Sequence, residues 1–284
     1  MRMGPWEVAI VSGGTFRLDG GSMFGTVPKV LWDRVCPADA ENRILMATNC
    51  LLLRGEVDGR RRTILVDNGN GDKETDGFMA RFDFEGRGVL ERSLKAHGVT
   101  PDAIDLVILT HLHFDHAGGS TRLDPAGNPV PAFANARYVV QGRDLENARH
   151  PHLRERASYF PKNWEPLEAA GVLDILSGPT ELLPGLSVRL VPGHTGGLQA
   201  VVVEGDGRRL IYPADLIPTS HHIQPAWVMG YDLDVVTCVD ERLRLLEEVA
   251  GTDTILVFEH DPTIPAGTVS LDTKGKYTVT PVAV

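Results

Sequence analysis

Short apolar runs, each stopped by glycine, proline or polar residues, mark the first part of the chain. Glu7 to Val11, Leu45 to Leu53 and Thr63 to Val66 are three such runs, and their pattern predicts strands. The third run ends in the polar, glycine-rich turn Asp67-Asn68-Gly69-Asn70-Gly71. The segment from Gly13 to Pro37 shows little periodicity, so we expect a long loop there, of a length that is often functional inside a compact domain.

Helical spacing alternates with apolar runs in the rest of the chain. Gly88 to His97 has the spacing of a helix and leads into Asp105 to Leu109, a continuous apolar run that is typical of a buried strand. The pattern predicts further strands at Arg137–Gln141, Ser187–Val191, Gln199–Glu204, Arg209–Tyr212 and Thr254–Phe258, and further helices at Asp144–Arg149 and over 235–249. Such alternation indicates an α/β fold. We find no linker, low-complexity tract or repeat, and therefore predict one domain spanning residues 1–284.

The composition narrows the possible partners. The 284 residues include 28 Lys and Arg against 38 Asp and Glu, a net charge of −10, which disfavours nucleic acid because phosphate contacts rely on basic residues. The chain has no apolar stretch of about 18 residues and no charged N-terminal segment followed by an apolar one. We expect no membrane association and a cytoplasmic location. Cys36, Cys50 and Cys238 show no metal or redox spacing, and we expect them to be incidental thiols.

Four potential metal ligands follow the apolar run at Asp105 to Leu109. They are His111, His113, Asp115 and His116, within the sequence Thr110-His111-Leu112-His113-Phe114-Asp115-His116. Imidazole and carboxylate groups are preferred zinc ligands, and catalytic zinc sites keep a position open for water. Residues two apart in an extended segment point to the same side, so His111 and His113 can chelate one ion, while Asp115 and His116 face a neighbouring position. Histidines with purely structural partners at a helix start are the alternative interpretation.

Three later strands also end in a possible ligand. Leu190-Val191-Pro192-Gly193 precedes His194, Ile211-Tyr212-Pro213-Ala214 precedes Asp215, and Val257-Phe258-Glu259 precedes His260. Open α/β sheets place their sites at the carboxyl ends of strands, so we expect these side chains to lie near the first cluster.

In this order, the motifs resemble those of the metallo-β-lactamase superfamily. The resemblance rests on His111, His113, Asp115 and His116, then on His194 in a Gly-His-Thr turn, Asp215 and His260. It implies a four-layer αβ/βα sandwich of two mixed sheets flanked by helices. It also implies that His111, His113 and His194 hold one metal, that Asp115, His116 and His260 hold a second, and that Asp215 bridges the two. Asp67 matches a turn that supports the ligands in this family.

The resemblance implies hydrolysis by a metal-bridging hydroxide, because two divalent ions about 3.5–4 Å apart lower the pKa of a shared water to near 7. Zinc is the expected ion, although imidazole suits iron equally and an iron-dependent persulfide dioxygenase stays an alternative. Asp115 is expected to transfer a proton during the reaction. The substrate is expected to be a small molecule.

The segments around Phe24 to Trp32 and Ala214 to Thr219 resemble those of the superfamily branch that contains N-acyl-homoserine lactonases and organophosphate hydrolases. This resemblance implies a lactonase or carboxylic esterase, with a role in quorum quenching. That branch carries a carbonyl-binding Tyr where this chain has Pro218. We expect His221 or His222 to replace it, unless both are structural. Met23, Phe24, Leu31, Trp32, Trp164 and Trp227 are expected to line an acyl pocket or to form a homodimer interface.

Three other functions fit parts of the pattern less well. A glyoxalase-II-like thioesterase needs basic residues for glutathione, and we identify none. A phosphotriester or phosphodiester hydrolase uses the same metal ligands. A protein that keeps the fold without the chemistry would have lost ligands, whereas all seven positions are filled here.

Overall fold

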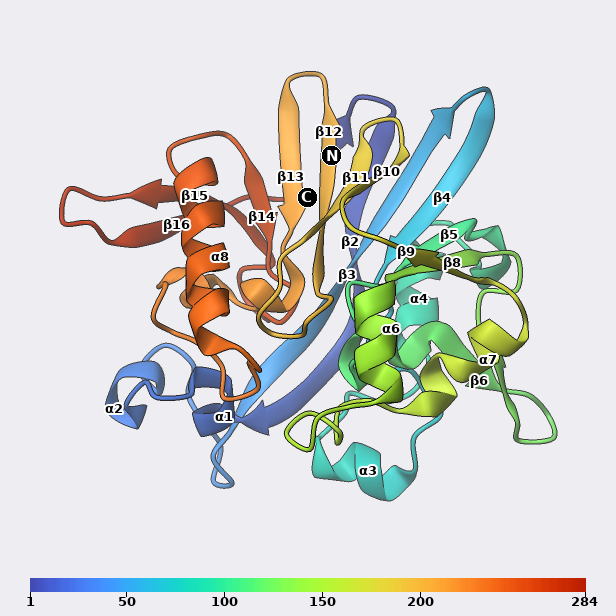
Figure 1. Cartoon of the computed structure of the whole chain (residues 1–284), viewed down its shortest axis with the longest axis horizontal. Coiled ribbons are helices and arrows are strands. Elements are labelled where there is room, and N and C mark those ends of the chain that lie inside the picture. The colour runs from blue at the N-terminus through green and yellow to red at the C-terminus, as the bar shows by residue number, and fades with distance from the viewer.

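Two seven-stranded mixed sheets lie face to face, with helices on their outer sides (Figure 1). The computed structural model describes all 284 residues. A cluster of 35 buried residues, drawn from both sheets, forms the core between them. A second cluster of 20 lies between the first sheet and its helices. The predicted four-layer sandwich is therefore confirmed.

The first sheet has the strand order β1-β2-β3-β4-β5-β8-β9. Its strands are β1 (Arg2–Met3), β2 (Trp6–Asp19), β3 (Arg43–Val57), β4 (Arg60–Val66), β5 (Leu106–Ile108), β8 (Arg137–Gln141) and β9 (Leu173–Leu176). The first four strands pair antiparallel, and β4, β5, β8 and β9 pair parallel. The parallel part needs helical crossovers, as the alternating pattern predicts.

The second sheet follows chain order from β10 to β16. Its strands are β10 (Thr180–Leu183), β11 (Leu186–Leu190), β12 (Gln199–Gly205), β13 (Arg208–Tyr212), β14 (Ile255–Val257), β15 (Ala266–Leu271) and β16 (Tyr277–Pro281). Only β13 and β14 pair parallel, and the long helix between them covers the outer face of this sheet (Figure 1). A separate hairpin is formed by β6 (Thr121–Leu123) and β7 (Pro129–Pro131).

Eight helices complete the fold, and most are short. They are α1 (Gly20–Phe24), α2 (Lys29–Trp32), α3 (Asp76–Arg81), α4 (Val89–Ala96), α5 (Phe114–Ala117), α6 (Gly142–Arg149), α7 (Glu165–Ala169) and α8 (Val235–Val249). Five 3₁₀ turns occur at Pro101–Ala103, Gly118–Ser120, Pro161–Asn163, Ala214–Leu216 and Ser220–Ile223. No helix is both long and apolar enough to cross a bilayer.

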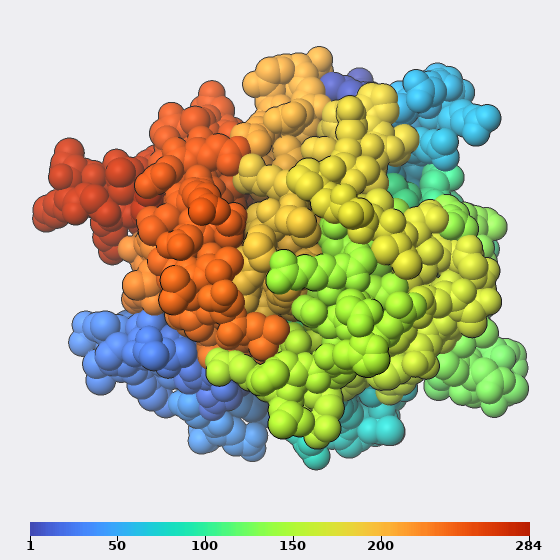
Figure 2. All heavy atoms as spheres, in the orientation of Figure 1, coloured from blue at the N-terminus to red at the C-terminus, as the bar shows by residue number.

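The expected long loop from Gly13 to Pro37 is wrong in its first part. Residues up to Asp19 continue β2, which passes a register shift between Ser12 and Thr15 and pairs with β3 along its whole length. Gly13 and Gly14 interrupt the apolar pattern at that irregularity, so the pattern does not predict the continuation of the strand. The remainder forms α1 and α2, and the segment coloured blue makes a lobe beside the orange segment (Figure 2).

Hydrogen bonds between the sheets fix the edge at which they meet. Asn49 of β3 donates its amide to the carbonyl groups of Phe258 and Asp261, which follow β14. From the second sheet, Gln199 donates to the carbonyl groups of Leu109 and Thr110, which follow β5. These bonds attach the loop after β14 to the first sheet and the loop after β5 to the second sheet.

Candidate metal centre

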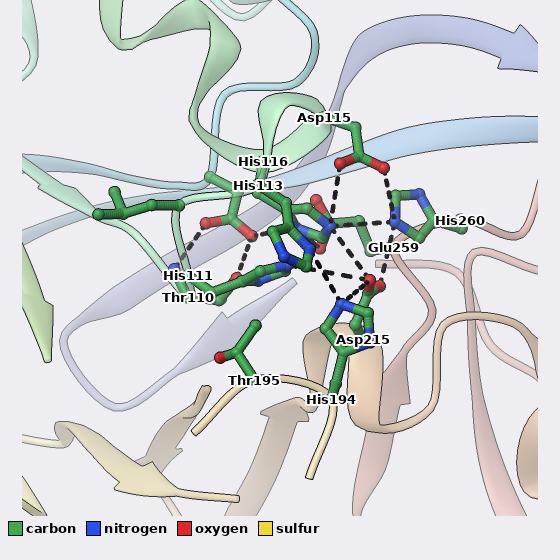
Figure 3. A network of polar contacts seen from close by, with 12 residues as sticks. Thr110, His111, His113, Asp115, His116, His194, Thr195, Asp215, Glu259 and His260 are labelled. Atoms are coloured by element: carbon green, nitrogen blue, oxygen red, sulfur yellow. Dashed lines mark hydrogen bonds and ion pairs between the residues drawn. The ribbon is translucent and has the colours of Figure 1, made fainter. Parts of the chain in front are cut away.

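Five histidines and two aspartates converge at this edge (Figure 3). They are His111, His113, Asp115, His116, His194, Asp215 and His260, and each is at most 7% exposed. The first four follow β5, with His113 preceding α5, so that Asp115 and His116 lie in the first helical turn. His194, Asp215 and His260 follow β11, β13 and β14 of the other sheet. The structure thus brings together all seven residues that the sequence singles out as ligands.

The carboxylate of Asp215 lies between the two sets of histidines. Its Oδ2 is 3.0 Å from Nε2 of His194 and 3.5 Å from Nε2 of His116. Its Oδ1 is 3.1 Å from Nε2 of His260, and Nε2 of His111 lies 3.9 Å from Oδ2. Asp215 therefore contacts residues of both expected metal positions.

The possible ligand atoms of these seven residues fall into two groups whose members lie within 4.8 Å of one another. One group contains His111, His113, His194 and Asp215, and the other contains Asp115, His116 and His260. This is the division that the family resemblance implies. Neutral imidazole and carboxylate donors match the preferences of divalent zinc.

Buried nitrogen atoms without a partner, and imidazole nitrogens that face each other, indicate that these residues are suited to binding cations. Nε2 of His111 is buried without a hydrogen-bond partner. Nδ1 of His113 lies 3.1 Å from Nε2 of His194, and Nε2 of His116 lies 3.2 Å from Nε2 of His260. Buried polar atoms are costly when unpaired, and two imidazole nitrogens face each other only around a shared proton or a cation. The donor set is therefore suited to divalent ions.

The direction of their pKa shifts separates four of the ligand histidines into two pairs. Burial, with neighbouring imidazoles, holds the pKa of His111 well below its usual value and lowers that of His113 to about 3, so both are neutral. Burial also lowers the pKa of His194 and His260, but the Asp215 carboxylate outweighs it and raises their pKa to about 10 and about 9. Cations that occupied the centre would take the place of these protons.

Each of four ligand histidines has a hydrogen-bond partner on its Nδ1 atom. Asp232 lies 2.9 Å from His194, Asp67 lies 3.0 Å from His116, and the carbonyl oxygen of Ala47 lies 2.8 Å from His260. The hydroxyl of Thr110 lies 3.1 Å from His111. Such partners fix the ring orientation and the tautomer, leaving Nε2 free for a metal. Asp67 also accepts from the backbone and hydroxyl of Thr110, a position that agrees with its expected supporting role.

A second buried carboxylate, that of Glu259, lies beside the imidazole of His116. Its Oε2 is 2.9 Å from Nδ1 of His116, close to Asp67. Burial raises the pKa of Glu259 to about 8, although His116 opposes the shift, so this carboxyl holds a proton at neutral pH. Neither carboxylate oxygen of Glu259 has a hydrogen-bond partner, and the protonated group adds no second negative charge beside Asp67. The Glu259-His260 pair at a strand end is the only sequence signal for this residue.

A small cavity of about 150 Å³ opens onto the metal centre. His113, Asp115, His194, Asp215 and His260 form its polar side. The remaining lining residues are Leu18, Met23, Phe82, Phe114, Ala157, Ser158, Met229 and Tyr231. No Lys or Arg side chain lines it.

The structure does not place His221 or His222 in this cavity, which corrects the expectation that one of them acts on the substrate. His222 is buried, and both its ring nitrogens are engaged, one 2.7 Å from the hydroxyl of Thr219 and the other 2.9 Å from the carbonyl oxygen of Met23. Its ring stacks on Phe24. His221 lines a different cavity, near Cys36 and Asp261. His222 therefore serves the packing of the N-terminal segment.

Of the six residues expected to line an acyl pocket, only Met23 reaches the cavity. Phe24 stacks on Trp32, and both are buried in a separate core cluster with Trp227 against them. Trp164 belongs to the core under the first sheet. Leu31, at 45% exposure, stays available for the dimer interface, which remains a prediction.

Comparison with known proteins places these features in a family. Residues 43–260 match the model of the metallo-beta-lactamase superfamily. An N-acyl homoserine lactonase from Bacillus sp is 28% identical over 171 residues, which cover 59% of this chain and 60% of that protein. The chain thus spans less than two thirds of the curated relative that it matches.

Two solved structures share the fold over the whole of this chain. A probable metal-dependent hydrolase from Staphylococcus aureus superposes with a TM-score of 0.86 at 28% identity and is covered completely. AidC, a dizinc quorum-quenching lactonase solved with a product, has a TM-score of 0.79 at 23% identity over 97% of its length.

Replacing Asp232 with Asn tests whether the partners of the ligand histidines matter. The amide cannot accept from both Nδ1 of His194 and the backbone N–H of Met229, which the carboxylate now contacts with separate oxygens. We expect zinc affinity, measured by chelator competition, to fall about 10- to 100-fold. Asp234→Asn is the control, because this exposed residue caps α8 and does not contact a ligand. Equal zinc affinity in the wild type and Asp232→Asn would contradict the assignment.

Proposed function

The chain belongs to the metallo-β-lactamase superfamily, and from this premise we propose that it is a dinuclear metal-dependent hydrolase that opens lactones or cleaves uncharged carboxylic esters. The observation that carries the proposal is the position of Asp215 between two groups of buried ligands. The similarity to an N-acyl homoserine lactonase supports the choice of lactones.

In this proposal, His111, His113 and His194 would hold one ion, Asp115, His116 and His260 would hold the other, and Asp215 would contribute to both sites. Two bound divalent ions would lower the pKa of a water and polarise a carbonyl oxygen. Asp115 lines the cavity and is 3.7 Å from Nε2 of His260, so its carboxylate can take a proton from the attacking water and pass it to the leaving alkoxide.

The cavity favours small, uncharged substrates. Its apolar side chains, Met23, Phe82, Phe114 and Met229 among them, can bury a ring or a short acyl chain. Its volume of about 150 Å³ resembles that of an engineered cavity that binds benzene. A lactone ring therefore fits inside, and a long acyl chain has to extend beyond the cavity.

The absence of Lys and Arg from the lining favours uncharged substrates. Charges of a substrate that lie away from the metal centre, such as the carboxylates of a glutathione thioester, would find no cationic side chain in the lining. Uncharged phosphotriesters do not meet this obstacle and are the second candidate substrates. Neutral lactones and esters fit the lining best.

Tyr231 is our candidate for the hydrogen-bond donor that Pro218 cannot supply. It is the only phenol that lines the cavity. Burial raises the pKa of this phenol, the nearby Asp115 carboxylate adds to the shift, and Ser22 opposes it. The hydroxyl is therefore protonated at neutral pH and can donate to the substrate carbonyl or to the leaving oxygen.

The proposal predicts chelator-sensitive opening of lactones, measured as proton release by the zinc-loaded protein. We expect turnover of γ-butyrolactone, δ-valerolactone and short-chain acyl-homoserine lactones, with kcat/KM levelling off beyond about six acyl carbons because the cavity is small. Asp215→Ala and a metal-free sample are the controls, and both should lose at least 100-fold in rate. A protein that binds two zinc ions and turns over no lactone or ester would contradict the substrate assignment.

The Tyr231→Phe variant tests the proposed donor. Loss of one hydrogen bond to the developing charge should lower kcat for lactones about 10- to 100-fold, with zinc content and KM little changed. The control is Tyr277→Phe, which removes a phenol in β16, outside the cavity lining. Unchanged kcat in Tyr231→Phe would assign the phenol to packing alone.

A further inference from the structure

His113 differs from the other four ligand histidines. Its Nδ1 lies 3.1 Å from Nε2 of His194 and thus faces the centre of its ligand group. Its other nitrogen, Nε2, is buried and has no hydrogen-bond partner, whereas the outward nitrogen of each other ligand histidine has one. A ligand histidine nearly always donates its second N–H to an acceptor. No direct hydrogen bond therefore supplies an acceptor for Nε2 of His113.

Glu155 presents a carboxylate oxygen to this nitrogen. The residue is only 5% exposed, and its Oε2 is buried without a hydrogen-bond donor. This oxygen lies 3.9 Å from Nε2 of His113. Two buried atoms of complementary type, each lacking another partner, thus face each other.

The chain around Glu155 is fixed to the segment that carries His113. Tyr159 forms an isolated β-bridge with His113, and the backbone N–H of Phe114 donates to the carbonyl of Ser158. The rings of Tyr159 and His113 are 4.7 Å apart in an edge-to-face arrangement. These contacts keep Glu155 beside the imidazole, although the two residues are far apart in the sequence.

We propose that Glu155 is a positioning residue that accepts the Nε2–H of His113 and so directs its Nδ1 lone pair toward the metal. The inference rests on the proposed function, because it assigns a role to Glu155 in the same metal centre. A separation of 3.9 Å exceeds a direct hydrogen bond by about 1 Å, so a small side-chain movement or one bridging water completes the contact. With Glu155, all five ligand histidines have an outer partner.

Glu155 also lines a polar cavity of about 540 Å³ with Arg143, His150 and His152. A carboxylate that served only a ligand in this outer cavity would leave His113 unaffected. The two roles therefore predict different results for the zinc affinity and for the His113 tautomer.

The test compares wild type with Glu155→Gln and Glu155→Ala, using Glu146→Gln as the control. Glu146 is an exposed carboxylate of the same region and pairs only with His150. Zinc affinity is measured by chelator competition, and the tautomer of His113 is read from the 15N chemical shifts of its ring in the zinc-loaded protein. Far-UV circular dichroism checks the fold, and Glu155→Gln keeps the side-chain volume should Glu155→Ala unfold.

We expect zinc affinity at one of two sites to fall about 10- to 100-fold in Glu155→Ala, and less in Glu155→Gln, whose amide oxygen still accepts. The Nε2–H signature of His113 should be lost or mixed in Glu155→Ala and stay unchanged in Glu146→Gln. Folded variants with wild-type affinity and tautomer would overturn the inference. Failure of wild type to bind zinc would instead overturn the proposed function, so the two failures are distinguishable.

Discussion

The burial of six ionisable side chains around the Asp215 carboxylate is the constraint that organises this structure. Four histidine Nε2 atoms lie within 3.9 Å of its oxygens. In a water-excluded setting, such groups are tolerated only when protons or cations compensate their charges and lone pairs. Bound divalent ions would satisfy these donors at once and would allow the protein to bury the set at the edge of two apolar sheets.

The surrounding scaffold maintains this concentration of ligands. Asp144 holds two ligand segments together, because its carboxylate accepts from the backbone of Leu112 and from the hydroxyl of Thr195. Just before Asp215, the buried Ala214 has φ of +48°, a conformation that is unfavourable for a residue with a Cβ atom. Strain of this kind persists where neighbouring structure determines the backbone, and here it turns the chain so that Asp215 enters the centre.

Much of the centre could be predicted because its ligands follow apolar strands at the same edge of the sheets. That rule, together with the family motifs, predicts His111, His194 and His260 as ligands from the sequence alone. Supporting residues such as Asp232 and Glu155 lie in irregular segments that tertiary contacts bring to the site. No spacing in the sequence predicts their roles. The prediction for His222 was wrong because closeness to Asp215 in the sequence did not place its side chain at the site. The ring of His222 packs against Phe24 instead.

The same distinction holds for the fold. Central strands and the helix α8 carry strong periodicity and were predicted, whereas the extension of β2 past Gly13 and Gly14 was not, because glycine breaks the apolar pattern at a register shift. The hairpin β15–β16 was also missed, since its outer residues are exposed and its pairing decides the structure.

Anomalous X-ray diffraction from crystals of the zinc-loaded protein, recorded on both sides of the zinc absorption edge, tests the central claim most directly. The account predicts two peaks about 3.5–4 Å apart, one beside His111, His113 and His194, the other beside Asp115, His116 and His260, with Asp215 in contact with both. A single peak, or two peaks that Asp215 does not join, would contradict it.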